Sequence, residues 1–181
     1  MIYNEKEILL KDGSRCLFRS PEGKDAKEML SYLRTCAEET NFILRYPEEV
    51  TETIEEEAAF LKSIVDSNSN LMIAAVINGE IAGNCQLAIH KRMKTSHRGT
   101  VAIGLKKKYW GIGLGTAIFQ ELIAISKKNG VSQLELEVIE GNTRAIALYK
   151  KMGFFNYGER KNSIKLKDGS FVSEFLMMRY V

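Results

Sequence analysis

Proline, histidine and long apolar runs are all scarce in this sequence. Its 181 residues include two prolines, Pro21 and Pro47, and two histidines, His90 and His97. Because zinc sites in proteins use clustered histidine and cysteine ligands, such a site is hard to assemble here, and we expect no metal. No window approaches the roughly 18 apolar residues of a membrane span, and the N-terminus lacks the apolar core of a signal peptide. We therefore expect a cytoplasmic protein without a membrane partner.

Cysteine is also rare, and the net charge is small. The three cysteines, Cys16, Cys36 and Cys85, form no CxxC pair, which fits reduced thiols better than a disulfide framework. A net charge of +3 is too mild to indicate a nucleic-acid partner, and no basic stripe is interleaved with stacking aromatics. Repeats, low-complexity tracts and linkers are absent as well. These observations favour one globular domain over residues 1–181.

Turn and helix signals predict the fold class. Strand-like segments flank three X-Gly pairs that are typical of hairpin turns, namely Asp12-Gly13, Asn78-Gly79 and Asp168-Gly169. Helical apolar spacing predicts helices over about 26–37, 54–65 with a capping box at Thr53 and Glu56, the segment from the glycines after Trp110 to Gly130, and Asn142 to Gly153.

The third predicted helix lies between two predicted strands, Thr100 to Leu105 and Gln133 to Val138. A strand, helix, strand order favours parallel pairing of the two strands, whereas the hairpins are antiparallel. The sequence therefore predicts an α+β fold with a mixed, mostly antiparallel sheet flanked by helices.

The segment YWGIGLGTAIF, Tyr109 to Phe119, has glycines at positions 111, 113 and 115. Exposed backbone N–H groups at the mouth of a helix favour an anion such as phosphate. The plainer interpretation is that these glycines only permit tight packing of strand against helix. A Walker A loop is excluded because no Gly-Lys-Ser/Thr closes the motif.

A second motif follows the glycines, and the two together resemble the GNAT superfamily of N-acetyltransferases, which bind acetyl-coenzyme A. The main motif of that family, Arg/Gln-x-x-Gly-x-Gly/Ala, falls on WGIGLG, where Trp110 stands in place of Arg or Gln. The resemblance is strong from Val101 to Phe154, and the order of hairpins and helices extends it to the whole chain. The second motif consists of Asn142, Arg144, Ala145, Leu148, Tyr149, Gly153 and Phe154.

The resemblance implies a site for acetyl-coenzyme A as co-substrate. The strand end would pair its backbone with the pantetheine arm, the amides from Gly111 to Thr116 would hold the pyrophosphate, and Lys106 to Lys108 would either add charge near the phosphates or form a solvated cluster. Because Trp110 stands at the Arg/Gln position, either the backbone amides contribute more to binding the pyrophosphate or the indole packs against the coenzyme. The expected cofactor-binding residues are Ile103, Gly104, Leu105, Trp110, Gly111, Ile112, Gly113, Leu114, Gly115, Thr116 and Asn142.

Tyr149 is the expected catalytic residue, as a general acid for the departing thiolate. Its place on the apolar stripe of a helix equally suits a core aromatic, and Asn142 equally suits a helix cap. The general base stays open between Glu137 or Glu39, either of them acting through a water, and water alone, with His97 a weaker choice.

The expected activity is direct transfer of the acetyl group, in a ternary complex, to a primary amine of a small molecule or peptide. Eight glutamates between Glu38 and Glu57 either form a solvated helix face or attract a cationic amine. Homodimers are frequent in the family, so a homodimer is left open.

Two other functions are also left open. One is a non-catalytic acyl-coenzyme A binding module. The other is a nicotinamide-dependent oxidoreductase, with Glu135 or Glu137 as the ribose-binding acid. The oxidoreductase ranks behind the transferase because Thr116 occupies its third glycine position and the segment from Lys106 to Trp110 replaces its tight turn.

Overall fold

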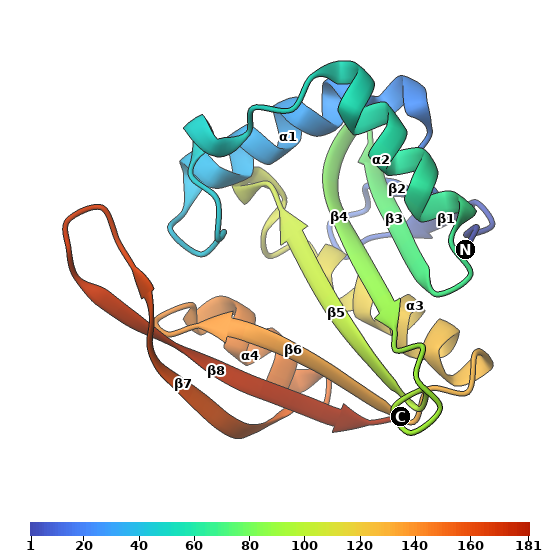
Figure 1. Cartoon of the computed structure of the whole chain (residues 1–181). Coiled ribbons are helices and arrows are strands. Elements are labelled where there is room, and N and C mark those ends of the chain that lie inside the picture. Colours follow the sequence, from blue (N-terminus) through green and yellow to red (C-terminus); the bar gives the residue numbers. More distant parts are fainter. The chain divides into compact units, whose positions relative to one another are not determined.

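The computed structural model describes residues 1–181 and contains eight strands, four α-helices and three short 3-10 helices (Figure 1). The elements are β1 Lys6–Leu9, β2 Arg15–Arg19, η1 Gly23–Asp25, α1 Ala26–Glu39, η2 Pro47–Glu49, α2 Ile54–Asp66, β3 Asn70–Ile77, β4 Glu80–Ile89, β5 Arg98–Leu105, η3 Lys107–Tyr109, α3 Leu114–Lys128, β6 Gln133–Ile139, α4 Thr143–Lys151, β7 Phe155–Lys165 and β8 Phe171–Tyr180.

The chain forms two compact units, and both β5 and α3 run from one into the other. The first unit comprises Met1–Ala88 and Ile103–Ile118, and the second comprises Ile89–Ala102 and Phe119–Val181. The prediction of a single domain over residues 1–181 stays a prediction.

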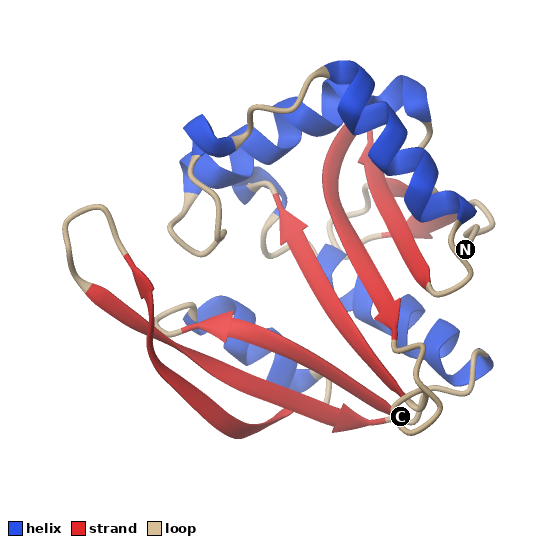
Figure 2. Cartoon of the chain, in the orientation of Figure 1, coloured by secondary structure: helices blue, strands red, loops and turns tan.

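Strand pairing confirms the predicted mixed and mostly antiparallel arrangement. The order of hydrogen-bonded neighbours is β1-β2-β3-β4-β5-β6-β8-β7. β5 and β6 run parallel, with Arg98 opposite Gln133, as the strand, helix, strand order predicts. The pairs β1/β2, β2/β3, β3/β4, β6/β8 and β7/β8 are antiparallel. β7 and β8 form a long hairpin in the second unit (Figure 2).

All three predicted hairpin turns are confirmed. Asp12-Gly13 joins β1 to β2, Asn78-Gly79 joins β3 to β4, and Asp168-Gly169 joins β7 to β8. Asn78 and Gly79 have φ angles of 51° and 79°, the left-handed pair that a two-residue hairpin turn of the primed type requires. This turn places Glu80 at the first position of β4.

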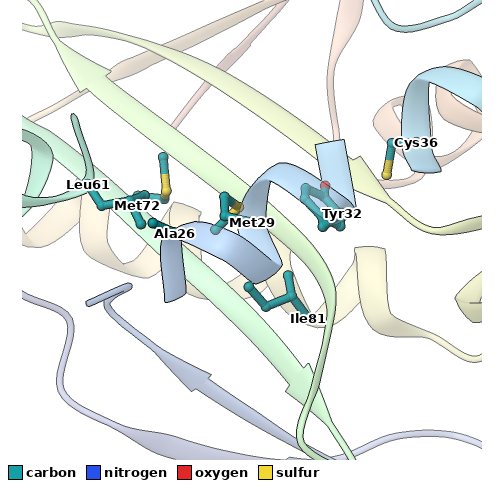
Figure 3. Packing of buried hydrophobic residues seen from close by; sticks show 7 residues of the cluster. All are labelled: Ala26, Met29, Tyr32, Cys36, Leu61, Met72 and Ile81. Carbon is teal, nitrogen blue, oxygen red and sulfur yellow. The ribbon is translucent and has the colours of Figure 1, made fainter. Parts of the chain in front are cut away.

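The core of the first unit lies between its two helices and its strands (Figure 3). Ala26, Met29 and Tyr32 of α1 repeat at helical spacing and are almost fully buried. They cluster with Cys36 of α1, Leu61 of α2, Met72 of β3 and Ile81 of β4. The predicted apolar face of the first helix therefore does form the core.

Aromatic side chains from α3 and α4 form part of the second unit's core. The ring of Phe119 meets Tyr149 edge-on at a centroid distance of 5.4 Å and Phe154 at 5.6 Å. Gly153, with a φ of 83°, ends the segment of α4 as the sequence predicts, and Phe154 then turns into this cluster. None of the helices combines the length and apolarity that crossing a bilayer demands.

The capping box of α2 supplies a test of local stability. Glu56 N donates to Thr53 Oγ1 at 3.1 Å, and Thr53 N donates to Glu56 Oε2 at 2.8 Å. Because Thr53→Ala removes the hydroxyl that accepts from Glu56 N, one donor in the first turn of α2 loses its partner, and we expect the free energy of unfolding to fall by about 1 kcal/mol in urea titrations. Thr51→Ala, at an exposed position before the box, is the control. Equal stability of the two variants would contradict the cap's contribution.

Candidate functional site

The glycine loop joins β5 to α3 within the first unit. Gly111 and Gly113 have φ angles of 86° and 94°, a region that L side chains rarely adopt. A Cβ on Gly113 would also lie 3.0 Å from Lys11 Cγ, and Lys11 N donates to the Ile112 carbonyl O at 3.1 Å. The loop is therefore packed against the chain before β2, and two of its positions demand glycine.

The loop presents backbone donors where α3 begins. Leu114, Gly115 and Thr116 form the first turn of the helix, whose N–H groups have no intrahelical acceptor. Ala117 N is bonded to the Gly113 carbonyl O at 3.1 Å. These donors coincide with the positive end of the helix dipole, so this end of α3 is chemically suited to a phosphate group.

The predicted strand end, Ile103 to Leu105, lies in the same unit as the loop. On one side it packs against Tyr32 of α1. A Cβ on Gly104 would lie 2.5 Å from the Tyr32 hydroxyl oxygen, and a Cβ on Gly83 would lie 2.7 Å from the Gly104 carbonyl O. Tyr32 Oη donates to Asn84 Oδ1 at 3.3 Å, and burial raises the pKa of its phenol. Glycine at position 104 therefore permits close packing of β5 against α1.

Trp110 has a bond that the sequence did not suggest. Its indole Nε1 donates to the Leu105 carbonyl O at 2.9 Å, which ties the start of the glycine loop to the end of β5. The sequence suggested two consequences of Trp110: the loop amides bind the pyrophosphate without help from this side chain, or the indole packs against the coenzyme. Neither describes a hydrogen bond from the indole to the backbone of β5. No motif distinguishes an indole that binds its own backbone from one that binds a ligand.

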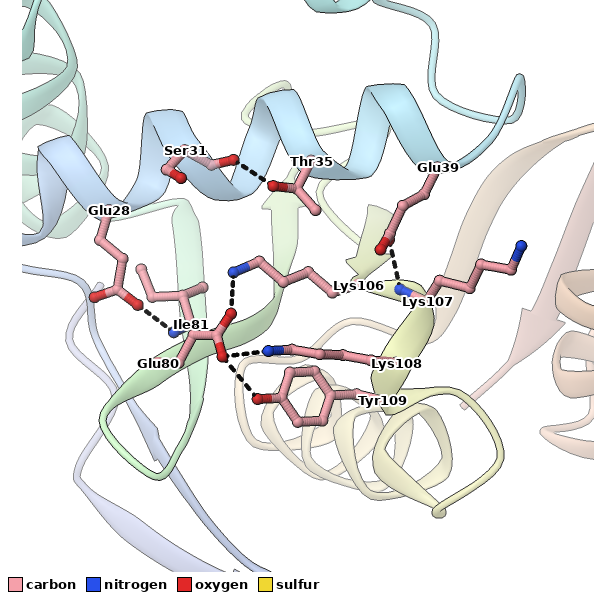
Figure 4. A network of polar contacts seen from close by, with 10 residues as sticks. All are labelled: Glu28, Ser31, Thr35, Glu39, Glu80, Ile81, Lys106, Lys107, Lys108 and Tyr109. Carbon is pink, nitrogen blue, oxygen red and sulfur yellow. Dashed lines mark hydrogen bonds and ion pairs between the residues drawn. The ribbon is translucent and has the colours of Figure 1, made fainter.

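The lysines before the loop are ion-paired. Lys106 Nζ lies 2.6 Å from Glu80 Oε1, and Lys108 Nζ lies 2.5 Å from Glu80 Oε2 (Figure 4). The interpretation of a solvated cluster is wrong for Lys106, which is buried. Glu80 was not predicted from the sequence, because only the β3–β4 hairpin brings it to lysines that are 26 and 28 residues away.

Asn142 and Tyr149 lie in the second unit, on α4. Asn142 Oδ1 accepts from Ala145 N at 3.2 Å, which confirms the helix cap. Tyr149 is 7% exposed within the aromatic cluster, which confirms its core position. Burial raises the pKa of Tyr149 to about 12, so its phenol stays protonated at neutral pH. The roles of Tyr149 as acid and of Asn142 as a pantetheine contact stay predictions.

The candidate bases already have partners. Glu137 is bound by Arg160, with Nη2 and Oε1 2.8 Å apart, and this pair lowers the pKa of the carboxyl. Glu39 Oε2 accepts from Lys107 N at 2.6 Å. Glu135, the alternative ribose-binding acid, is paired with Arg98 at 2.6 Å. The exposed His97 lies before β5. The base therefore stays open between a carboxylate that would leave its partner and water.

The acidic stretch from Glu38 to Glu57 has mixed roles. Glu52 pairs with Arg45 at 2.8 Å, whereas Glu49 and Glu56 accept hydrogen bonds from backbone N–H groups at helix starts. Glu57 is buried, and burial together with the nearby Glu52 raises its pKa. Several of these glutamates are therefore structural, and no group of three or more His, Cys, Asp or Glu side chains could hold a metal ion.

A surface recess of about 490 Å³ lies in the first unit beside α2. It is lined by Pro21, Glu22, Gly23, Ala58, Ala59, Lys62 and Val65. None of the predicted site residues lines it, so the glycine loop is the better candidate site.

Comparison with known proteins finds a protein family whose matched region includes this loop. The model of the acetyltransferase (GNAT) family matches residues 28–154. A GNAT-family acetyltransferase from Streptococcus pneumoniae superposes with a TM-score of 0.85 at 30% identity, covering 92% of this chain and 99% of that one. A structure from Salmonella typhimurium that contains its cofactor acetyl-CoA superposes with a TM-score of 0.77 over 91% of this chain and 93% of that one, and at 14% identity it supports the fold alone.

Two curated relatives are N-acetyltransferases of Escherichia coli strain K12. The L-amino acid N-acetyltransferase AaaT is 29% identical over 108 residues, which are 59% of this chain and 66% of that protein. The [ribosomal protein bS18]-alanine N-acetyltransferase is 40% identical over 67 residues, which are 37% of this chain and 45% of that protein. The matches thus span about half to two thirds of these relatives. From the family match and the Streptococcus structure, we conclude that this chain belongs to the GNAT family of acetyltransferases.

Proposed function

We propose that the protein transfers the acetyl group of acetyl-coenzyme A to a primary amine by direct attack in a ternary complex. The observation that carries this proposal is the glycine loop, whose backbone donors at the start of α3 would form a cradle for a pyrophosphate. Gly111 and Gly113 adopt left-handed φ angles that keep side chains out of this cradle. The family match supports coenzyme A as the source of the phosphates.

The residues of the first unit would bind and orient the coenzyme. Acetyl-coenzyme A supplies an acyl group that the thioester already activates. The amides of Leu114 to Thr116 would accept the pyrophosphate charge, and the backbone of Ile103 to Leu105 would pair with the pantetheine arm and polarise the carbonyl. Asn142 would add a contact from α4 in addition to its role as a cap.

Tyr149 would act as the general acid. With its pKa raised to about 12 by burial, the phenol holds its proton throughout the physiological range. Such a group can protonate a departing thiolate when the two are within hydrogen-bond reach. The attacking amine must be neutral, and water would take its proton, since Glu137 and Glu39 both have partners.

Direct transfer also agrees with the state of the thiols. Cys16, Cys36 and Cys85 are all buried. Burial raises the pKa of Cys16 and Cys85 to about 12 and that of Cys36 to about 11. Because the thiolate is the nucleophilic form of cysteine, none of the three is suited to form an acyl-enzyme.

An amine of an amino acid or a peptide is the proposed acceptor. The curated relatives are named for L-amino acids and for the alanine of a ribosomal protein. Some of the glutamates between Glu38 and Glu57 would attract an ammonium group to the first unit. We further propose that the reaction takes place in the cytoplasm.

A panel of amines tests the activity. We expect release of free coenzyme A thiol from acetyl-coenzyme A with at least one amino acid or peptide amine, followed with a thiol reagent. Calorimetry of acetyl-coenzyme A and NADH should detect binding of the first alone. Binding of acetyl-coenzyme A with no turnover on any amine would favour a non-catalytic binding module, and tight NADH binding would contradict the proposal.

Replacing Tyr149 by Phe tests the acid. The variant keeps the ring that meets Phe119, so the fold should persist, and we expect kcat to fall about 100-fold while the affinity for acetyl-coenzyme A hardly changes. Tyr157→Phe, at an exposed tyrosine, is the control. An unchanged kcat would leave Tyr149 with a core role only.

Replacing Gly113 by Ala tests the loop. Its positive φ makes the new side chain cost about 1–2 kcal/mol, and the Cβ would press on Lys11. If that strain distorts the cradle, the dissociation constant of acetyl-coenzyme A should rise about tenfold in calorimetry. Gly130→Ala is the matched control, because Gly130 also has a positive φ but nothing within 4 Å of the added Cβ. Equal weakening by both variants would mean that lost stability, not the loop, is responsible.

A further inference from the structure

Glu80 is the centre of a polar network next to the glycine loop. Its carboxylate accepts hydrogen bonds from Lys106 Nζ at 2.6 Å, Lys108 Nζ at 2.5 Å and Tyr109 Oη at 3.0 Å (Figure 4). The three donors lie on the short segment, Lys106 to Tyr109, that leads into the loop. One side chain at the start of β4 therefore holds this segment at three points.

Further bonds hold the same segment from neighbouring elements. Lys106 N donates to the Ala82 carbonyl O at 3.0 Å, and Lys107 N donates to Glu39 Oε2 of α1 at 2.6 Å. Glu28 of α1 accepts from Ile81 N at 2.5 Å, which ties α1 to β4 beside Glu80. β4 and α1 thus form a frame on which the approach to Gly111 is fixed.

The charges in this network already compensate one another. Lys106 is buried, so its ammonium depends on the Glu80 carboxylate for a counter-charge. The ammonium groups of Lys106 and Lys108 and the Tyr109 hydroxyl lower the pKa of Glu80 to about 2. The carboxylate therefore stays ionised at physiological pH, and these two lysines already have a partner other than a phosphate.

We propose that Glu80 is a positioning residue for the coenzyme-binding loop. It holds Lys106 to Tyr109 in the conformation from which the amides of Gly111 to Thr116 reach the pyrophosphate, and it does not touch the coenzyme itself. The inference rests on the proposed function of the loop. Its consequence is that the two lysines act on coenzyme binding through Glu80, as fixed supports of the loop, and not as phosphate ligands.

Glu80→Gln tests the inference, because the amide keeps the shape of the side chain but loses its charge. If the loop is then in its binding conformation for about one tenth of the time, the dissociation constant and KM of acetyl-coenzyme A rise about tenfold, whereas kcat and the KM of the amine change less than twofold. Glu7→Gln is the matched control, because it breaks the exposed pair between Glu7 and Arg15 in the same unit.

The single tryptophan provides a readout that does not depend on activity. Trp110 follows the held segment directly, so its fluorescence reports on the loop. We expect acrylamide to quench this fluorescence more readily in Glu80→Gln than in the wild type or Glu7→Gln. In the wild type, the contribution of Glu80 is complete above the ordinary glutamate pKa of 4.5 and is lost as the pH falls through about 2. No step in Trp110 quenching from this group is therefore expected between pH 5 and pH 8.

If Glu80→Gln does not fold, Tyr109→Phe and Lys108→Met test the inference instead. Each removes one bond to Glu80, from the half-buried Tyr109 or from the exposed Lys108. Each should raise the dissociation constant and the quenching in the same direction, with a smaller effect. Unchanged binding of acetyl-coenzyme A in these variants would overturn the inference. Tighter binding in Glu80→Gln would overturn it too, because the freed lysines would then reach the phosphates. If the wild type itself binds no acetyl-coenzyme A, the proposed function fails; if it binds and the variants bind equally well, only this inference fails.

Discussion

The unpaired N–H groups at the start of α3 are the constraint on which the candidate site depends. A helix leaves its first donors without partners, and in this chain the left-handed Gly111 and Gly113 keep side chains away from them. Such an end is suited to an anion because the donors and the helix dipole act in the same direction. The hydrogen bond from Lys11 N to the Ile112 carbonyl O and the tether from Trp110 to Leu105 then hold the loop at both of its sides.

The distribution of charge around the loop can be understood from the same need to bind an anion at the start of α3. A binding site for an anion gains from nearby positive charge, yet a buried lysine needs a counter-charge of its own. Glu80 supplies it for Lys106, and α1 contributes Glu39 as an acceptor for the backbone of the lysine segment. The pyrophosphate would therefore depend on backbone dipoles more than on lysine side chains, which agrees with the absence of Arg or Gln at position 110.

Much of the fold could be predicted because its signals are local. The Asn78-Gly79 turn, the Thr53 capping box and the apolar stripe of α1 each depend on residues within a few positions of one another, and all three are confirmed. For the same reason the glycine loop could be located from YWGIGLGTAIF alone. The buried state of Lys106 could not, because three consecutive lysines have the sequence pattern of a solvated surface.

The sequence by itself determined the elements, their order and the family, since turns, caps and the two motifs are short patterns with direct physical causes. Only the tertiary structure decided what each polar side chain binds. Glu80 meets Lys106 and Lys108 because the β3–β4 hairpin returns next to the end of β5, and Glu137 meets Arg160, which is 23 positions away in the chain. Ion pairs of this kind depend on strand register and hairpin geometry, which no local pattern of residues specifies.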